Sequence, residues 1–540
     1  MCDEIKDVDG MLAHVGDFST YQAILICLFS FINILSAFHY FGQTFTSLVP
    51  EYICNTSSTN QALQCSVRVF QNNSGYIEEP CTTGWIYNNT NTHGYISIVQ
   101  EFNWVCSNNW KPVLGQSVFF VGSVIGGVAL GVLADNIGRL HTLIIANMFA
   151  FLGNIITTIS SDAIIFAISR FIAGCATDAN FVMMYIIVME YLRPNMRTFG
   201  LNFCIGVFYC LSCIAIPWVV AWIGTWRSFL LVVSLSHLLV LLFYLIVPES
   251  AQWLISKGRT EEAIECFKKI ARINRKILRP KAVESLLQYS NQHIKCDESK
   301  ENFFGLLKTP NLRRKTLVLI YKSMVLTLCY DAISKNVNGT GLSPYVVFTI
   351  SSSTIFPACL FILAIQDKVG RKALASGSLL ISGAFSVCAG IYLVFFKNPE
   401  PIALLVLAIV ARLGINVAYN SGHQYAVELL PTVVRGQAVA IVHVVGYGAA
   451  FFSTEILYLA DFWKPSPEII LGILMISGAV ACLFLPETLN KSLPVTLEDG
   501  ENFGEDEKLF QFVMCGKDGK SENTIILQGA VYDNPVYNDR

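Results

Sequence analysis

Asp178 is the residue best placed to carry chemistry, because it lies near the middle of an apolar run at residues 163–187. An ionisable group at membrane depth is costly and is by default a functional candidate. Arg170 precedes Asp178 by eight residues and therefore lies on roughly the same face of a helix. Asp178 is expected either to bind a cationic substrate directly or to be neutralised by Arg170 or Arg412 as part of the scaffold.

Aromatic and amide side chains on other apolar runs could complete a site around this carboxylate. Aromatic faces hold organic ammonium groups with about 0.5 to 2 kcal/mol each when the groups are desolvated. The candidates are Tyr185, Tyr321, Tyr419 and Tyr447, with Asn420, Gln424 and His39 as polar contacts and Glu455 as a second acid. For any single tyrosine, helix packing is an equally good explanation.

Four polar residues in the apolar runs, including His39, also have simpler interpretations. Asp331 is expected to be a solvated charge at the rim of a helix, and Lys322 to extend its ammonium to a nearby interface. His39 and His443 could titrate near neutrality and couple transport to protons, although packed hydrogen-bond donors are the commoner case.

Enzymatic chemistry is not predicted, because nothing resembles a nucleophile with its base or a metal cage. Gly519-Lys520-Ser521 resembles the end of a phosphate-binding loop, but Met514 stands where that loop requires a glycine. No ATP site, cofactor, metal or nucleic-acid partner is therefore expected.

The elements that position these residues are membrane spans. With 53% hydrophobic and only 14% charged residues in 540, the chain has too little polar surface for a soluble protein. An all-α membrane protein is predicted, with about twelve apolar runs long enough to cross a bilayer as helices, six in each half. They lie near residues 22–44, 113–133, 142–160, 163–187, 200–222, 228–247, 316–334, 344–364, 374–395, 401–421, 437–459 and 468–485.

Short motifs recur about 235 residues apart, which indicates two homologous bundles in one chain. Each bundle has an Asp-x-x-Gly-Arg motif in a short turn. The glycine allows the chain to reverse, and the charged side chains can pair in one conformation and separate in the other. Plain anchoring of the hairpin is the simpler alternative for one copy. The predicted gating or latch residues are Asp135, Gly138, Arg139, Arg170, Glu190 and Arg197 in the first half, and Asp367, Gly370, Arg371, Arg412, Glu428 and Arg435 in the second. A third pair is Pro248-Glu249-Ser250 and Pro486-Glu487-Thr488.

Loop charge predicts the orientation. Residues 249–315 hold about fifteen Lys and Arg, whereas residues 45–111 hold only Arg68 and Lys111. The basic loop and both termini are therefore expected to be cytoplasmic. The predicted units are a cytoplasmic N-terminus (1–21), a six-helix bundle (22–248), the basic loop (249–315), a second bundle (316–486) and an acidic cytoplasmic tail (487–540).

The 45–111 loop has the chemistry of an extracellular segment. Asn55, Asn72 and Asn88 begin or lie within glycosylation acceptor sequences. Cys54, Cys65, Cys81 and Cys106 indicate two disulfides of unknown pairing, while a zinc site is disfavoured because the cysteines lack close pairs.

Together these motifs resemble the organic cation, carnitine and organic anion transporter family of the major facilitator superfamily, closest to its cation and carnitine branch. The resemblance covers about residues 9 to 500 and also rests on Gly16-Asp-Phe18, Ser97-Ile-Val-Gln-Glu101-Phe-Asn-Trp-Val-Cys106, Arg170-Phe-Ile-Ala-Gly174, Trp226-Arg227 and Thr309-Pro310-Asn-Leu312-Arg313. It implies two six-helix halves that rock around a central site.

Departures from that family affect the cargo. At the position of Tyr447, the cation branch of the family typically has aspartate, and the anion and carnitine branches typically have arginine. Ile355 takes the place of a glutamate of the family. Asn136 and Gln252 replace basic residues in the first latch and the Pro-Glu-Ser motif.

The sequence therefore predicts a plasma-membrane secondary transporter of small organic cations or zwitterions, such as amines or carnitine-like compounds. An organic anion transporter using Arg170 or Arg412 is the alternative within the family. A non-transporting sensor or scaffold is the alternative from another class, because Asn534-Pro535-Val536-Tyr537 in the tail is similar to adaptor ligands, although chance explains four residues equally well. The expected partners are an organic ion, the lipid bilayer and this adaptor.

Overall fold

The computed structural model describes residues 11–505 apart from 13–14, 17–18, 57–60, 72–74, 91, 193–203, 279, 297–302, 337–341, 397, 432–433, 490, 492–493 and 495. Twelve helices in this described part are long and apolar enough to cross a membrane, which confirms the twelve predicted spans. The chain is therefore a multi-pass membrane protein. The adaptor-like sequence at residues 534–537 and the latch residue Arg197 lie outside the described residues.

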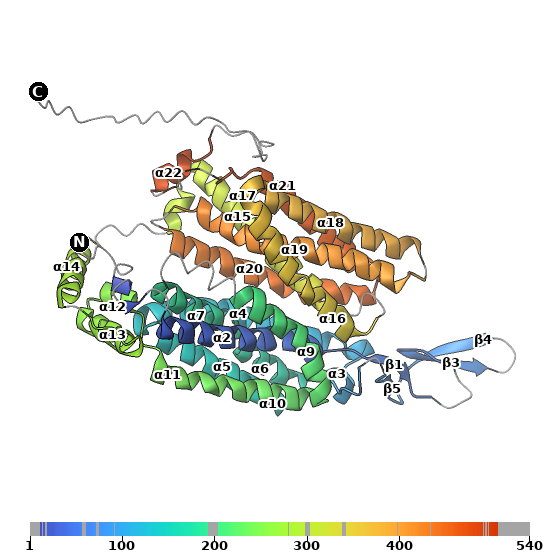
Figure 1. Ribbon diagram of the computed structural model, residues 1–540. Coiled ribbons are helices and arrows are strands. Elements are labelled where there is room, and N and C mark those ends of the chain that lie inside the picture. The colour runs from blue at the N-terminus through green and yellow to red at the C-terminus, as the bar shows by residue number, and fades with distance from the viewer. Residues whose placement is uncertain are drawn as a thin grey trace, which may run out of the picture.

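The helices form two halves that lie one above the other in Figure 1. The first half contains α2 (Thr20–Thr46), α4 (Trp110–Ile137), α5 (Arg139–Thr158), α6 (Ala163–Cys175), α7 (Thr177–Tyr191), the π-helical turn η2 (Cys204–Tyr209), α9 (Cys210–Ile223), α10 (Trp226–His237), η3 (Leu238–Leu242) and α11 (Phe243–Ile246). The second half contains α15 (Pro310–Lys335), α16 (Pro344–Ser353), α17 (Ile355–Val369), α18 (Arg371–Phe395), α19 (Pro401–Leu429), α20 (Arg435–Tyr458), η5 (Leu459–Asp461) and α21 (Ser466–Leu483). Helices α4 and α20 contact each other across the boundary.

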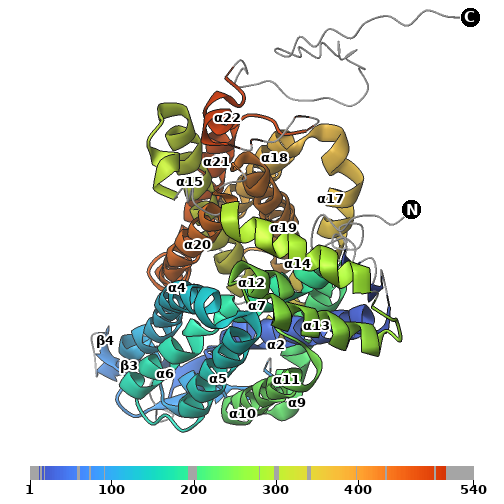
Figure 2. The same cartoon turned by 90° about the vertical axis from the view of Figure 1, so that its left-hand side faces the viewer.

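Short elements occupy the two opposite ends of these bundles. At one end, here the strand end, β1 (Glu51–Cys54) pairs antiparallel with β5 (Trp85–Asn88), with Glu51 opposite Asn88. A second antiparallel sheet has the order β2 (Gln61–Ala62), β3 (Ser66–Gln71) and β4 (Gly75–Pro80), and α3 (Ile98–Glu101) and η1 (Cys106–Asn108) follow. The other end, here the basic end, carries α12 (Ala251–Ser256), α13 (Thr260–Ile273), α14 (Pro280–Cys296), η4 (Phe303–Leu307) and α22 (Leu497–Asn502). Figure 2 looks onto the basic end, with α12 to α14 in front.

Local sequence explains where many helices begin. The Asp162 carboxylate accepts hydrogen bonds from the Ile164 and Ile165 N–H groups at 2.7 and 2.9 Å and so caps α6. Helices α15, α16 and α19 each begin with a proline, whose missing N–H is not needed in the first turn.

The core at the strand end joins the two halves. Phe41 and Phe45 of α2 pack on Phe348 of α16, with ring centroids 5.6 and 5.2 Å apart, and Phe45 also stacks on Tyr345 at 5.5 Å. The Tyr345 hydroxyl donates a hydrogen bond to the Thr92 carbonyl at 3.3 Å. The structure therefore has its two halves closed against each other at the strand end.

The four loop cysteines form the disulfides Cys54–Cys81 and Cys65–Cys106. This resolves the pairing that the sequence left open. Asn55 and Asn88 lie exposed on the same loop, whereas Asn72 is outside the described residues.

We expect a non-reducing peptide map to link Cys54 with Cys81 and Cys65 with Cys106. The bridges span 27 and 41 residues, and loops of this length imply about 3 to 4 kcal/mol of stabilisation each in the chain-entropy description. Paired Cys→Ser substitutions should therefore make the loop more sensitive to protease than the wild type. A map that links Cys54 with Cys65 would contradict the fold of this loop.

Candidate substrate site and latches

Asp178 lies at the boundary between the two halves. Helix α6 ends at Cys175 and α7 begins at Thr177, so Asp178 is in the first turn of α7, where the helix dipole favours a negative charge. A Cβ added to Gly127 of α4 would lie 3.6 Å from the Asp178 Oδ2 and 3.7 Å from Val444 of α20. The carboxylate therefore sits beside the contact between α4 and α20.

Two tyrosines lie near this carboxylate and two more adjoin them, and the four are here named the tyrosine cluster: Tyr209, Tyr330, Tyr419 and Tyr447. Tyr419 and Tyr447 are hydrogen-bonded to each other, and both lie within electrostatic range of Asp178. The ring centroid of Tyr330 is 4.5 Å from that of Tyr419, and the Tyr209 phenol lies within electrostatic range of the other three. A carboxylate beside several aromatic faces is the arrangement that binds an organic ammonium group.

The two buried arginines are occupied elsewhere. Arg170 donates hydrogen bonds to the side-chain oxygens of Gln43 and Asn154, both at 3.3 Å. Arg412 donates to the Tyr330 carbonyl at 2.9 Å and its guanidinium lies 4.3 Å from the Tyr330 ring centre. Among the residues that the structure describes, neither arginine forms an ion pair with Asp178. Both arginines also lie within the helix bundles, away from the latches. The sequence alone had grouped them with the latch residues.

Two of the predicted contact residues, Tyr321 and Gln424, lie away from the tyrosine cluster. Tyr321 is 39% exposed and its hydroxyl bonds Ser477 of α21 at 2.6 Å. It precedes Tyr330 by nine residues, which is two and a half helical turns, so it faces the opposite side of α15. The Gln424 amide donates to Glu428 at 3.1 Å and belongs to the second latch.

Three other candidates make local contacts. Tyr185 stacks on Phe181 with centroids 6.0 Å apart, and the Asn420 amide donates to the Asn416 carbonyl at 3.1 Å. Glu455 accepts a hydrogen bond from Ser117 of α4 at 2.9 Å and so joins the halves nearer the strand end.

His39 is a packed hydrogen-bonding residue rather than a substrate contact. Its Nε2 lies 3.0 Å from the Ala173 carbonyl and must donate to it, and its Nδ1 then accepts from the Asn154 amide at 3.1 Å. Both ring nitrogens of this neutral tautomer are satisfied.

The expectation of a solvated Asp331 is wrong, because this residue is fully buried. Its carboxylate pairs with Lys335 at 3.0 Å and accepts hydrogen bonds from Tyr40 at 2.6 Å and from Ser453. The Lys335 ammonium lies 4.4 Å from the Phe120 ring centre. Tyr40 and Phe120 come from the first half and the other three from the second, so these five residues form a buried lock between the halves.

The latches at the basic end are organised by one glutamate in each half, Glu249 and Glu487. Glu249 accepts hydrogen bonds from the N–H groups of Arg139 and Leu140 at 2.7 and 3.1 Å, and the Arg139 side chain pairs with Asp135 at 3.0 Å. Ser250 donates to Glu190.

The second half repeats this arrangement. Glu487 accepts from the N–H groups of Arg371 and Lys372 at 2.9 and 3.1 Å, the Arg371 side chain pairs with Glu428 at 3.2 Å, and Thr488 donates to Glu428. The structure describes neither the side chain of Asp367 nor that of Arg435.

Glu249 and Glu487 are absent from the latch residues predicted from the sequence. Their signal was present, because each stands in the third duplicated motif. Each carboxylate satisfies the first N–H groups of a helix, α5 or α18, which would otherwise lack partners.

The glycine of each latch gives a testable prediction. Gly138 and Gly370 have φ of +105° and +91°, and an added Cβ would overlap the carboxylate of Glu249 or Glu487. We expect Gly138→Ala or Gly370→Ala to destabilise the protein by about 1 to 3 kcal/mol, measured by thermal unfolding, and to lower transport. Gly377→Ala is the matched control, because nothing lies within 4 Å of the added Cβ and alanine favours a helix interior. Equal stability of all three variants would contradict the latch geometry.

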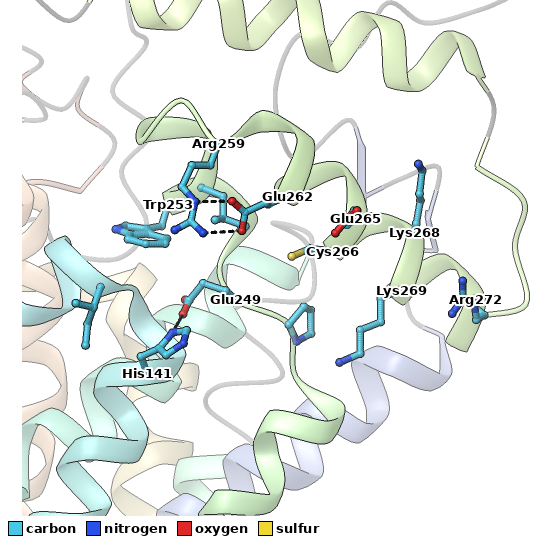
Figure 3. Close-up of a pocket in the computed structure, with 13 residues that line it drawn as sticks. His141, Glu249, Trp253, Arg259, Glu262, Glu265, Cys266, Lys268, Lys269 and Arg272 are labelled. Atoms are coloured by element: carbon cyan, nitrogen blue, oxygen red, sulfur yellow. Dashed lines mark hydrogen bonds and ion pairs between the residues drawn. The ribbon is translucent and has the colours of Figure 1, made fainter.

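A cavity of about 540 Å³ adjoins the first latch at the basic end. Figure 3 shows the His141–Glu249 contact and the Arg259–Glu262 pair among its lining residues. Burial, together with the Glu249 charge, raises the pKa of the Cys266 thiol to about 11, so this thiol is protonated at neutral pH. Both acidic and basic side chains line this cavity. The cavity lies outside the helix that carries Asp178.

Comparison with known proteins agrees with this architecture. Residues 59–496 match the sugar (and other) transporter family. An organic cation transporter protein of Drosophila melanogaster is 28% identical over 92% of this chain and 95% of its own length. Human solute carrier family 22 member 2 is 27% identical over 92% of this chain and 95% of its own length.

Solved structures share the fold. The inward-open xylose transporter XylE from E. coli matches with a TM-score of 0.61 and 16% identity, over 90% of this chain and all of the other. The same proton:xylose symporter bound to a bromo-deoxy-glucose matches with a TM-score of 0.59. The chain belongs to the sugar (and other) transporter family and, within the major facilitator superfamily, to the organic ion transporters.

Proposed function

We propose that this chain is a plasma-membrane secondary transporter of small organic cations that works by alternating access. The similarity to organic cation transporters over most of the chain supports the class. The observation that carries the proposal is the Asp178 carboxylate, which lies within electrostatic range of Tyr419 and Tyr447 and has no basic partner among the described residues.

This site suits an ammonium ion for electrostatic reasons. A carboxylate at membrane depth is expensive to leave unpaired, and a cation that enters restores the charge balance. The tyrosine faces replace part of the water that the cation loses. Because Asp178 and Tyr209 come from one half and the other tyrosines from the second, relative movement of the halves changes access to the site.

The orientation is part of the proposal. The excess of Lys and Arg in residues 249–315 supports a cytoplasmic basic end with both termini on the same side. The strand end with its disulfides, and with Asn55, Asn72 and Asn88 as glycosylation sites, is then extracellular. The buried lock lies toward the extracellular side and the latches lie at the cytoplasmic side.

An anion transporter would need a basic group available to the substrate at this site. Arg170 and Arg412 instead contact protein oxygens and aromatic rings. At Asp178 and the tyrosine cluster, the geometry therefore favours cations over anions.

Uptake by purified protein in liposomes tests the proposal. We expect saturable uptake of labelled butyltrimethylammonium that increases with an inside-negative potential, with amines competing and dicarboxylates not. Inhibition by dicarboxylates alone would instead support the anion transporter. The absence of any substrate-dependent flux would support the non-transporting scaffold.

A further inference from the structure

Lys322 is a buried ammonium group without a counter-charge. It is 1% exposed, so the expectation that it extends to an interface is wrong. Its Nζ donates a hydrogen bond to the Gly422 carbonyl at 2.6 Å and lies 5.2 Å from the Tyr425 ring centre. Within the described part of the chain, no carboxylate pairs with it. A charge in this position is costly unless an anion accompanies it.

Two histidines lie beside this ammonium. His423 of α19 and His443 of α20 stack with ring centroids 4.4 Å apart and planes 12° from parallel. The Nε2 of His423 is buried and has no hydrogen-bond partner among the residues that the structure describes. Lys322 is within electrostatic range of both rings. The three side chains together offer hydrogen-bond donors and one positive charge, which suits a carboxylate.

The histidines are in register with the tyrosine cluster. His423 follows Tyr419 by four residues on α19, and their ring centroids are 4.3 Å apart. His443 precedes Tyr447 by four residues on the antiparallel α20. Four residues correspond to one turn, or about 6 Å along a helix. The histidine pair therefore lies one turn closer to the basic end than Tyr419 and Tyr447.

We propose that Lys322, His423 and His443 form an anion subsite for the carboxylate of a zwitterionic substrate whose ammonium group lies at Asp178 and the tyrosine cluster. This inference rests on the proposed function and specifies its substrate class. The substrate is an ammonio-carboxylate that spans about one helical turn, from the level of Tyr419 and Tyr447 to that of His423 and His443. Lys322 supplies the charge, and the substrate carboxylate provides a hydrogen-bond partner for the Nε2 of His423.

A matched pair of labelled probes tests the subsite: butyltrimethylammonium and γ-trimethylammoniobutyrate, which differ in the terminal carboxylate. We expect Lys322→Met to lower the uptake ratio of the zwitterion to the cation by about tenfold or more, because a charge-assisted contact is lost. His423→Phe keeps a stacked ring, removes the N–H and should lower the ratio severalfold. Lys464→Met, which removes an exposed lysine near the strand end, should leave the ratio unchanged.

The outcomes separate this inference from the proposed function. If Lys322→Met and His423→Phe lower the uptake of both probes equally, the subsite is wrong although cation transport stands. If uptake of butyltrimethylammonium depends on chloride, the subsite takes a free anion and the assignment to substrate is overturned. If the wild type transports neither probe, the proposed function itself fails. Rates are normalised to folded protein, and His423→Phe carries the test where Lys322→Met does not fold.

Discussion

Asp178→Asn is expected to lower the uptake of a quaternary ammonium probe by roughly tenfold to a hundredfold. The substitution keeps the size of the side chain and removes its charge. Contacts to charged groups contribute about 1.5 to 3 kcal/mol, and each 1.4 kcal/mol is a factor of ten in affinity. The effect should appear mainly in KM, because the carboxylate contacts the substrate in the bound state. The measurement is the initial uptake rate as a function of probe concentration in liposomes.

Asp162→Asn is the matched control for this experiment. Asp162 caps α6 near the strand end, and asparagine caps helices as well as aspartate does. We therefore expect this variant to transport like the wild type. Uptake that is the same in wild type and Asp178→Asn would remove Asp178 as the charge partner of the substrate.

Lys335→Met should destabilise the protein by about 3 to 5 kcal/mol, because it leaves the buried Asp331 carboxylate without its counter-charge. The double variant Asp331→Asn with Lys335→Met should regain most of the loss, since no buried charge then stands alone. Because the lock joins the halves at the strand end, the single variant should also weaken the closed state there. Thermal unfolding of the purified protein measures the first effect.

An exposed ion pair provides the control for the lock. Arg259 and Glu262 are each about half exposed and pair at 2.6 Å. Arg259→Met should have little effect on stability, as is usual for surface pairs. If Lys335→Met proves to be as stable as Arg259→Met, then Asp331 is not held as a buried charge.

The twelve spans and the two halves were predictable because apolar runs and duplicated motifs are local features of the chain. The same duplication located both latches, and the position of Asp178 in an apolar run made it a candidate. Glu249 and Glu487 were visible as duplicated residues, but their role as acceptors for the starts of α5 and α18 depends on a contact more than a hundred residues away in sequence.

The other features of the site depended on contacts between neighbouring helices. The spacing of residues along one helix does not define these contacts. Tyr321 and Tyr330 share α15, yet only Tyr330 faces Tyr419. Asp331 and Lys335 have the spacing of a helical ion pair, but their burial follows from Tyr40 and Phe120 in the other half. The disulfide pairing likewise required the fold of the loop.

Counterflow in liposomes directly tests alternating access to the cation site. Liposomes with the purified protein are loaded with unlabelled butyltrimethylammonium, and the entry of the labelled compound is measured. We expect internal cation to accelerate entry, internal dicarboxylate not to do so, and Asp178→Asn to abolish most of the acceleration. Entry that is the same with and without internal cation would contradict alternating access.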